Sequence, residues 1–239
     1  MAPRPLLRRR RRSCRTGERE DLQYLFVLTY GRSGSTLLQG VLNAIPGVLV
    51  RGENHQVLRH LWRFETEARE ERDVQRRLRL RHGRLASGPT NSFYGIDGFP
   101  VTRARESIRR LALDTVLRPE PDTRIAGFKE IRWEEPDVSA YVAWLRVVFP
   151  GARFVVNTRD LDDVARSKWW ADRTDAREHL AAVEQRLLDV AADLDSAAYR
   201  VHYDDYVEDP ARLQGLFTWL GVPFDLELVR RTLAVRHSY

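Results

Sequence analysis

Residues 24–36 read YLFVLTYGRSGST, an apolar run followed by a turn rich in glycine and serine. The run is short and holds residues that favour strands, so it predicts a buried strand at the start of this stretch. Gly31 and Gly34 interrupt the run, and residues 36–44 predict a helix. A strand, a glycine-rich loop and a helix in this order are suited to binding a phosphate.

The chemistry of this loop supports an anion site. The first amides of a helix have no partner inside the helix and point toward an anion. Ser33, Ser35 and Thr36 add hydroxyl groups, and Arg32 adds a fixed positive charge. The loop lacks the lysine that precedes the hydroxyl residue in the phosphate loop of kinases and ATPases, because Ser35 precedes Thr36. The simpler interpretation is a tight turn followed by an ordinary helix N-cap.

The rest of the chain alternates strand and helix patterns, which favours an α/β fold with a mainly parallel sheet. In the predicted helix after the loop at 83–100, Ile108, Leu111, Ala112 and Val116 mark one apolar face. Further strands are predicted at 48–50, 123–131, 153–158 and 199–203, and further helices at 56–82, 139–149, 161–172 and 176–197, with two short helices closing the chain.

A second candidate anion site follows the strand at 153–158. Arg159 stands at its C-terminal end, and Ser167 follows eight residues later on the next predicted helix. Ligands of open parallel sheets bind beyond the C-terminal ends of the strands, and a guanidinium can bind a phosphate with two hydrogen bonds. The alternative is that Arg159 pairs with Asp162 or Asp163 and that Ser167 has no ligand.

Composition narrows the class of protein. The chain has 239 residues, of which 43% are hydrophobic, and a net charge of +6. Residues 1–20 contain eight arginines and two acids, so we expect a basic disordered tail and then a single domain at 21–239, without a nucleic-acid footprint. A single cysteine, Cys14, excludes a disulfide framework and a cysteine-rich zinc site.

No apolar run approaches the length of a membrane helix, and arginines follow the first leucines directly, so neither a membrane span nor a signal peptide is expected. The sequence therefore predicts a cytoplasmic protein. It does not indicate an oligomeric state.

Several motifs together resemble one known family. The segment 29–38, TYGRSGSTLL, resembles the 5′-phosphosulfate loop of sulfotransferases that use 3′-phosphoadenosine 5′-phosphosulfate (PAPS). The segment 155–159 with Ser167 resembles their 3′-phosphate site, including the spacing from arginine to serine. The segments 127–130, GFKE, and 201–210, VHYDDYVEDP, resemble a central strand beside the acceptor and the segment before a late helix.

The resemblance implies a P-loop-like, three-layer α/β fold and PAPS as donor, with 3′-phosphoadenosine 5′-phosphate (PAP) as product and no metal. It implies that Arg32 stabilises the departing phosphate and that Tyr203 stacks near the adenine, although Tyr203 also fits a buried strand residue. The implied nucleotide-binding residues are Gly31, Arg32, Ser33, Gly34, Ser35, Thr36, Leu37, Arg159, Ser167 and Tyr203.

The acceptor hydroxyl needs a base within hydrogen-bond distance. Glu53 is the first candidate, since it follows the second strand where the resembling family members carry a glutamate, and His55 is the second. Lys129 is expected to contact the sulfuryl oxygens, and Glu130 to orient the acceptor. The alternative for Glu53 is an ion pair with Arg51 or with Arg132.

The loop departs from that of the cytosolic steroid and phenol enzymes, because it carries Arg32 and Leu37 and so is closer to carbohydrate-type and bacterial members. The leading hypothesis is transfer of a sulfuryl group to a hydroxyl of a carbohydrate or a glycosylated natural product. Two alternatives stay open, a nucleotide-dependent small-molecule kinase and a non-catalytic module that binds PAP or another anion. Core packing is the favoured role of Trp133, Trp169 and Trp170, and Arg236 is a weak candidate for the 3′-phosphate.

Overall fold

The computed structural model describes residues 21–82 and 88–235. The predicted basic tail, Cys14 and Arg236 lie outside the described residues. Five parallel strands form one sheet in the order β2-β3-β1-β4-β5. The strands are β1 (Gln23–Leu28), β2 (Val48–Arg51), β3 (Ile125–Glu130), β4 (Arg153–Thr158) and β5 (Ala198–His202).

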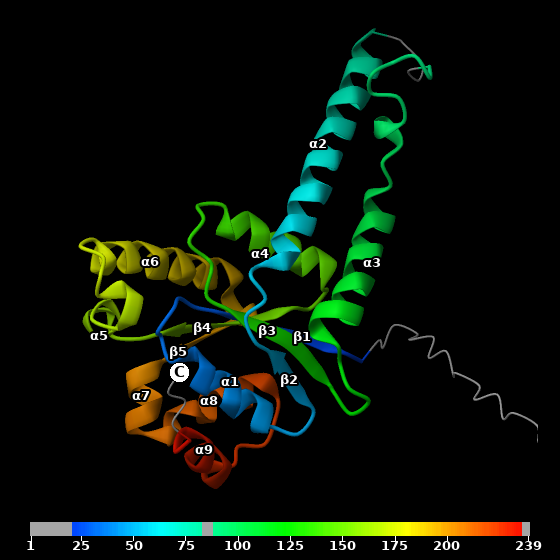
Figure 1. The fold of residues 1–239 in the computed structure, drawn as a ribbon. Helices are drawn as coiled ribbons and strands as arrows, with labels where there is room; N and C mark the ends of the chain where they lie inside the picture. Colours follow the sequence, from blue (N-terminus) through cyan, green and yellow to red (C-terminus); the bar gives the residue numbers. More distant parts are fainter. Residues whose placement is uncertain (1–20, 83–87, 236–239) are drawn as a thin grey trace, which may run out of the picture.

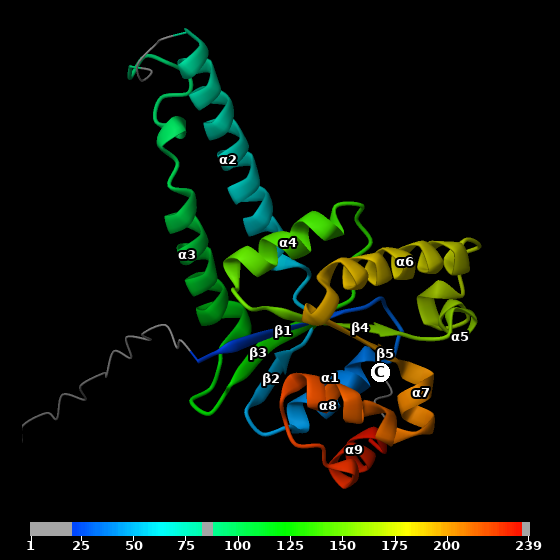
Figure 2. The same cartoon turned by 180° about the vertical axis from the view of Figure 1, so that it is seen from behind.

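The sheet lies between two layers of helices, as Figures 1 and 2 show. One apolar cluster joins Phe26 and Leu28 of β1 to helices on one face, and a second joins Leu25 and Val27 to helices on the other. The first layer contains α2 (Val57–His82), α3 (Val101–Ala112), α4 (Val138–Val148), α5 (Leu161–Ala165) and α6 (Ala176–Leu194). The second contains α1 (Ser35–Ala44), α7 (Tyr203–Glu208), α8 (Gln214–Leu220) and α9 (Leu226–Leu233).

Helices α2 and α3 form an arm that extends from the sheet, clearly seen in Figure 1. The base of the arm is fixed by Glu65, which is fully buried. Its carboxylate accepts hydrogen bonds from Trp144 Nε1 of α4 at 2.6 Å and from Arg105 Nη2 of α3 at 3.1 Å, and Arg69 Nε lies 3.4 Å away. Three elements thus meet at one buried carboxylate.

Local capping explains where several of the short helices begin. Asp160 accepts a hydrogen bond from the amide of Asp163 at the start of α5, and this bond lowers the pKa of the Asp160 carboxyl. Asp209 caps the one-turn helix that follows it, since it accepts from the amide of Ala211 with proline at the first helical position. Short one-turn helices occupy Ile96–Gly98, Lys168–Trp170, Asp195–Ala197 and Pro210–Leu213, and a π-helical turn occupies Leu113–Leu117.

The predicted strands and the helices at 56–82, 139–149 and 176–197 are confirmed with small shifts at their ends, and the sheet is parallel throughout. The helix predicted at 161–172 ends at Ala165, and α7, α8 and α9 follow the last strand where two short helices were predicted. Three single residues were also placed wrongly. Leu111 is 47% exposed, whereas Ile108 and Ala112 on the predicted face are buried. Tyr203 begins α7 instead of ending the last strand, and Ser167 lies in extended backbone after α5 instead of inside a helix. Within the described ranges, no helix is long and apolar enough to cross a membrane.

Candidate active site

The loop between β1 and α1 turns at Gly34, whose φ of 76° belongs to the left-handed region. A Cβ at this position would lie 2.0 Å from Cδ2 of Tyr203, the first residue of α7. The tyrosine ring therefore packs directly on the backbone of the loop. Helix α1 begins at Ser35, immediately after this turn. Its first amides and the hydroxyl of Thr36 therefore face the cavity described below.

Buried hydrogen bonds fix the loop to the neighbouring strand β4. The hydroxyls of Thr29 and Ser33 lie 2.6 Å apart, and Thr29 Oγ1 donates to the carbonyl of Asn157. Asn157 Nδ2 donates to the carbonyl of Ser33 at 2.9 Å. Ser33 is fully buried and is absent from the cavity lining. Its hydroxyl thus holds the loop in place, and we do not retain the expectation that it contacts the phosphate.

Arg32 is held by the segment that follows α5. Its backbone has a φ of 69°, a strained value for a residue with a side chain. Its Nε donates to Ser167 Oγ at 3.0 Å, and its guanidinium lies 5.9 Å from the ring centroid of Trp169. Trp170 Nε1 donates to the carbonyl of Gly31. The structure therefore joins two residues that the sequence assigned to separate anion sites, Arg32 and Ser167.

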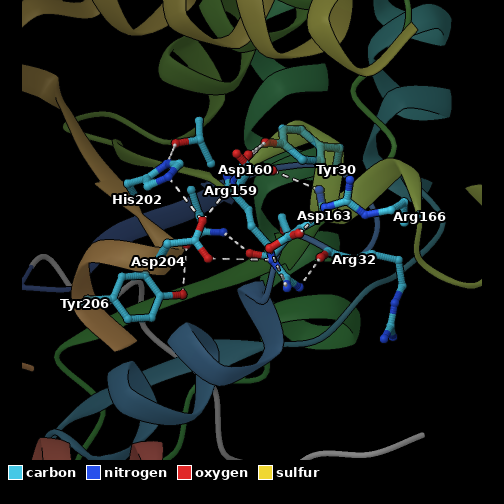
Figure 3. A network of polar contacts seen from close by, with 12 residues as sticks. Tyr30, Arg32, Arg159, Asp160, Asp163, Arg166, His202, Asp204 and Tyr206 are labelled. Carbon is cyan, nitrogen blue, oxygen red and sulfur yellow. Dashed lines mark hydrogen bonds and ion pairs between the residues drawn. The ribbon is translucent and has the colours of Figure 1, made fainter. Parts of the chain in front are cut away.

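Arg159 extends from the end of β4 into the same region, as Figure 3 shows. Its Nη1 donates to the carbonyl of Arg32 at 3.2 Å, and its guanidinium lies 4.6 Å from the ring centroid of Tyr203. Asp163 and Asp204 approach it only to 4.0 Å. The buried Nε of Arg159 has no hydrogen-bond partner among the described residues. The guanidinium therefore keeps donor capacity that an anion can use.

Tyr30 links the loop to Arg159 through the backbone. The amide of Arg159 donates to the Tyr30 hydroxyl at 2.9 Å, and the hydroxyl donates to Glu184 Oε2 at 2.5 Å. Burial, reinforced by the adjacent Glu184, raises the pKa of Tyr30 well above its ordinary value. The hydroxyl consequently stays protonated at neutral pH and holds the end of β4 beside the loop.

A lysine and a carboxylate stand on the other side of the loop. Lys129 of β3 is 3% exposed, and its Nζ lies 2.6 Å from Glu53 Oε1 and 3.5 Å from Thr36 Oγ1. The alternative pairing of Glu53 with Arg51 or Arg132 is wrong, because these two arginines contact other groups. Lys129 thus contacts both Glu53 and Thr36 of the loop between β1 and α1.

Glu130 and His55 occupy different surroundings. Glu130 is fully buried, and its carboxylate accepts from the amides of Asn54, Gln56 and Ile131. It therefore fixes the turn after β2, and no oxygen faces the cavity as the expected acceptor contact requires. His55 is exposed, adopts a φ of 57° and is absent from the cavity lining. These positions do not bring Glu130 or His55 to the site.

The remaining candidates, except Ser167, surround one cavity of about 890 Å³, a size typical of ligand pockets. Ser167 lies behind Arg32, to which it is hydrogen-bonded. The cavity lining carries four cationic side chains and one carboxylate. The lining residues are Gly31, Arg32, Gly34, Ser35, Thr36, Leu37, Glu53, Lys129, Ile131, Arg159, Lys168, Trp169, Tyr203, Val207, Leu233 and Val235.

Sequence reasoning missed part of this lining. Trp169 was assigned to the core but is 51% exposed and lines the cavity, whereas Trp133 and Trp170 are buried as expected. Lys168 was not singled out, although it directly follows Ser167, and its φ of 52° marks a second strained residue at the cavity. The sequence did offer one signal for Lys168, namely its position next to Ser167, which the sequence already assigned to an anion site. The aliphatic lining residues Val207, Leu233 and Val235 carried no signal in the sequence that could have identified them.

Comparisons with known proteins point to one family. Residues 25–226 match the model of the sulfotransferase family. The sulfotransferase domain of the Synechococcus PCC 7002 olefin synthase aligns with a TM-score of 0.54 and 20% identity, over 92% of this chain and 80% of that one. The sulfotransferase domain from the curacin biosynthetic pathway aligns with a TM-score of 0.52 and 18% identity, over 87% and 76%. No curated protein matches.

Identities this low show a shared fold alone, here a P-loop-like α/β fold with a parallel five-stranded sheet. The family model is the stronger finding, since it spans most of the described chain and includes both the loop after β1 and Arg159. The chain therefore belongs to the sulfotransferase family of enzymes.

Proposed function

We propose that this enzyme transfers the sulfuryl group of PAPS, the donor of its family, to a hydroxyl group of an acceptor. A carbohydrate or a glycosylated natural product is the acceptor class that we propose, because Arg32 and Leu37 of the loop are closer to carbohydrate-type members. The single observation that carries the proposal is the cavity in which the loop, Arg159, Lys129 and Glu53 come together.

The side chains of the cavity suit a nucleotide with several negative charges. Four cations face one carboxylate, and the unpartnered Nε of Arg159 offers a further donor. Because arginine and lysine supply the countercharge, no metal is needed in this proposal. PAPS supplies the activated sulfuryl group, whose bond to the nucleotide phosphate breaks as the acceptor oxygen bonds to sulfur.

Two groups of residues would hold the two ends of the nucleotide. The amides from Gly34 to Thr36 and the Thr36 hydroxyl bind the 5′ end, where Arg32 stabilises the charge that develops on the departing phosphate. Arg159 binds the 3′-phosphate. Ser167 accepts a hydrogen bond from Arg32, so its own hydroxyl hydrogen is available for that phosphate. Tyr203 is proposed to bind near the adenine.

Glu53 is the proposed base. Its side chain is 36% exposed and lies in the cavity, so an acceptor hydroxyl can reach it. As the acceptor oxygen attacks, its proton passes to the Glu53 carboxylate. Lys129 stands between Glu53 and Thr36, where its ammonium group stabilises negative charge between the base and the phosphate loop.

Calorimetric titration with PAP and, separately, with ADP tests the nucleotide, in both cases without magnesium. Micromolar binding of PAP with weak binding of ADP is the expected result. Tight binding of ADP with no response to PAP would refute the proposal and favour the kinase alternative. Binding of PAP without transfer to any hydroxyl acceptor would instead favour a non-catalytic module.

Replacing Glu53 by glutamine tests the base. Glu53→Gln should lower kcat by about 100-fold or more, because a positioned general base contributes at least that much. Its affinity for PAP should change little, since the proposed nucleotide contacts lie elsewhere. Turnover of PAPS and titration with PAP measure the two effects, and Glu208→Gln, at an exposed position outside the cavity lining, is the control. A Glu53→Gln enzyme with normal kcat would refute the assignment.

A further inference from the structure

The outer face of α2 has no neighbouring element among the described residues. Leu58, Trp62 and Glu65 face inward and are buried. On the opposite side of the helix, Val74 is 37% exposed and Leu78 is 43% exposed, whereas Phe64 packs against Phe99. Figures 1 and 2 show α3 beside α2 and α4 near its base. The outer face of the helix thus presents Val74 and Leu78 to solvent.

Charges on this outer face are divided along the helix. Glu67, Glu70 and Glu71 lie in the half of the helix nearer the sheet, with the exposed Arg63 four residues before Glu67, whereas Arg77 and Arg81 lie nearer the tip of the arm. Glu67 and Glu71 are four residues apart, as are Arg77 and Arg81, so each pair places like charges side by side on the helix surface. No hydrogen bond or ion pair joins Glu67, Arg77 or Arg81 to another described residue.

The two pairs are symmetric about Val74, which is 37% exposed at the centre of the outer face. Glu71 and Arg77 lie three positions before and after Val74, and Glu67 and Arg81 lie seven positions before and after it. A helix reversed about Val74 would thus present arginines to the glutamates and glutamates to the arginines. Self-complementarity of this kind is what a two-fold symmetric interface requires.

We propose that the outer face of α2 binds the same face of a second copy of this chain, with the two helices antiparallel and Val74 at the two-fold axis. In this dimer Glu71 lies opposite the partner's Arg77, and Glu67 lies opposite the partner's Arg81. Leu78 lies beside Val74 and opposite the aliphatic stem of the partner's Glu70. Each of the two glutamates thereby gains an arginine of the partner as its neighbour.

Sedimentation equilibrium of the full chain tests the assembly. We expect a dimer at low ionic strength that weakens as salt rises, because exposed charge pairs are screened. The double variants E67R/E71R and R77E/R81E should each raise the dimer dissociation constant at least tenfold, since each places like charges opposite each other at all four of the paired positions. All four positions are exposed or half-buried, so circular dichroism should show unchanged helix content.

Mixing the two variants gives the decisive result. Equimolar E67R/E71R and R77E/R81E should form a mixed dimer, because positions 67, 71, 77 and 81 then all carry arginine in one chain and glutamate in the other. The control is D189R/D193R, which reverses an exposed pair of acids with the same spacing on α6 and should leave dimerisation unchanged. A wild-type chain that stays monomeric at 100-fold the concentration used for assays, or variants that fail to associate on mixing, would overturn the proposal.

A cysteine at the axis gives an independent measurement. In a Cys14→Ser background, Val74→Cys should form an intermolecular disulfide under mild oxidation, because antiparallel helices in contact bring their facing Cα atoms within disulfide distance. Asp189→Cys in the same background should stay reduced. Equal cross-linking of the two variants would argue for random collision and against the interface.

Discussion

At the scale of single residues, the site holds two guanidinium groups close together. Arg159 donates to the backbone carbonyl of Arg32, and the Arg32 side chain bonds to Ser167. Both groups are therefore oriented before any ligand arrives, although their charges repel. A bound anion relieves this repulsion, so the arrangement favours ligands with several negative charges over those with one.

Removal of the Arg32 side chain tests its role at the departing phosphate. Arg32→Ala should lower kcat by about 100-fold or more, because loss of one oriented donor to a developing charge costs that much. Alanine and arginine carry the same penalty at positive φ, so the change isolates the side chain. Arg32→Lys, which keeps the charge, should recover part of the rate. Steady-state turnover of PAPS measures kcat, and a decrease in kcat of less than threefold in Arg32→Ala would contradict the role of Arg32 at the departing phosphate.

Arg159 is expected to read the 3′-phosphate. Wild-type enzyme should bind PAP more tightly than AMP, and Arg159→Ala should reduce that ratio about 10- to 100-fold, as expected for loss of a charged hydrogen bond. Calorimetry with both nucleotides measures the ratio. Arg166→Ala, which removes an exposed arginine on the same segment, should leave it unchanged. An unchanged ratio in Arg159→Ala would refute this site.

The sequence could predict those residues whose neighbours along the chain define them. The loop and Arg159 follow directly from strands that the sequence predicts well. The contact between Glu53 and Lys129 depends on how β2 and β3 lie in the sheet, so the sequence offered Arg51 and Arg132 as partners instead. Glu130 accepts from four backbone amides, of which those of Ile131 and Arg132 follow it directly in sequence. Only the folded turn after β2 brings the amides of Asn54 and Gln56 to it, so the sequence could not indicate its burial.

At the scale of elements, the arm of α2 and α3 depends on the buried carboxylate at its base. Glu65 satisfies donors from α3 and α4 together, so its loss leaves Trp144 and Arg105 without their acceptor. Unpaired donors in a buried site are costly, whereas an exposed charge on the same arm contributes little.

Glu65→Ala should therefore lower the free energy of unfolding by about 3 kcal/mol. Urea denaturation followed by circular dichroism measures the change. Glu106→Ala, an exposed acid on α3, should change stability by less than about 0.5 kcal/mol. If the two variants were equally stable, the carboxylate would not be what fixes the arm.

Elements with strong periodic patterns were predictable, and β4 has the bounds that the sequence indicates. Errors arose at the edges of helix faces and at element ends. Leu111 lies at the edge of the apolar face of α3, so it is exposed while Ile108 and Ala112 on the same helix are buried. Tyr203 was assigned to a strand because aromatic residues favour strands, but its ring packs on Gly34 from the first turn of α7.

At the scale of the whole molecule, tyrosines are buried in both helical layers. Burial raises the pKa of Tyr30, Tyr141 and Tyr206 above the ordinary value of 10.0. These side chains stay neutral in the folded protein while they ionise in the unfolded chain above that pH. Their contribution to stability is thus fully present below pH 10 and is lost as the pH rises further.

The free energy of unfolding should accordingly fall steeply between pH 10 and pH 11. Each of the three tyrosines contributes a slope of about 1.4 kcal/mol per pH unit. Urea denaturation across this range measures the slope. Tyr141→Phe should reduce it by about a third, because the hydroxyl of Tyr141 has no hydrogen-bond partner among the described residues and its removal changes little else. A slope that is identical in Tyr141→Phe would contradict this origin.

The nucleotide site is assembled from parts of the chain that are far apart in sequence. Thr29 bonds to Asn157, 128 positions later, and Gly34 packs on Tyr203. During synthesis on the ribosome the loop emerges early, yet β4 and α7 emerge much later. Affinity for the donor thus arises only when most of the chain has left the ribosome. A nucleotide that then binds at 100 times its dissociation constant would stabilise the completed fold by about 2.7 kcal/mol.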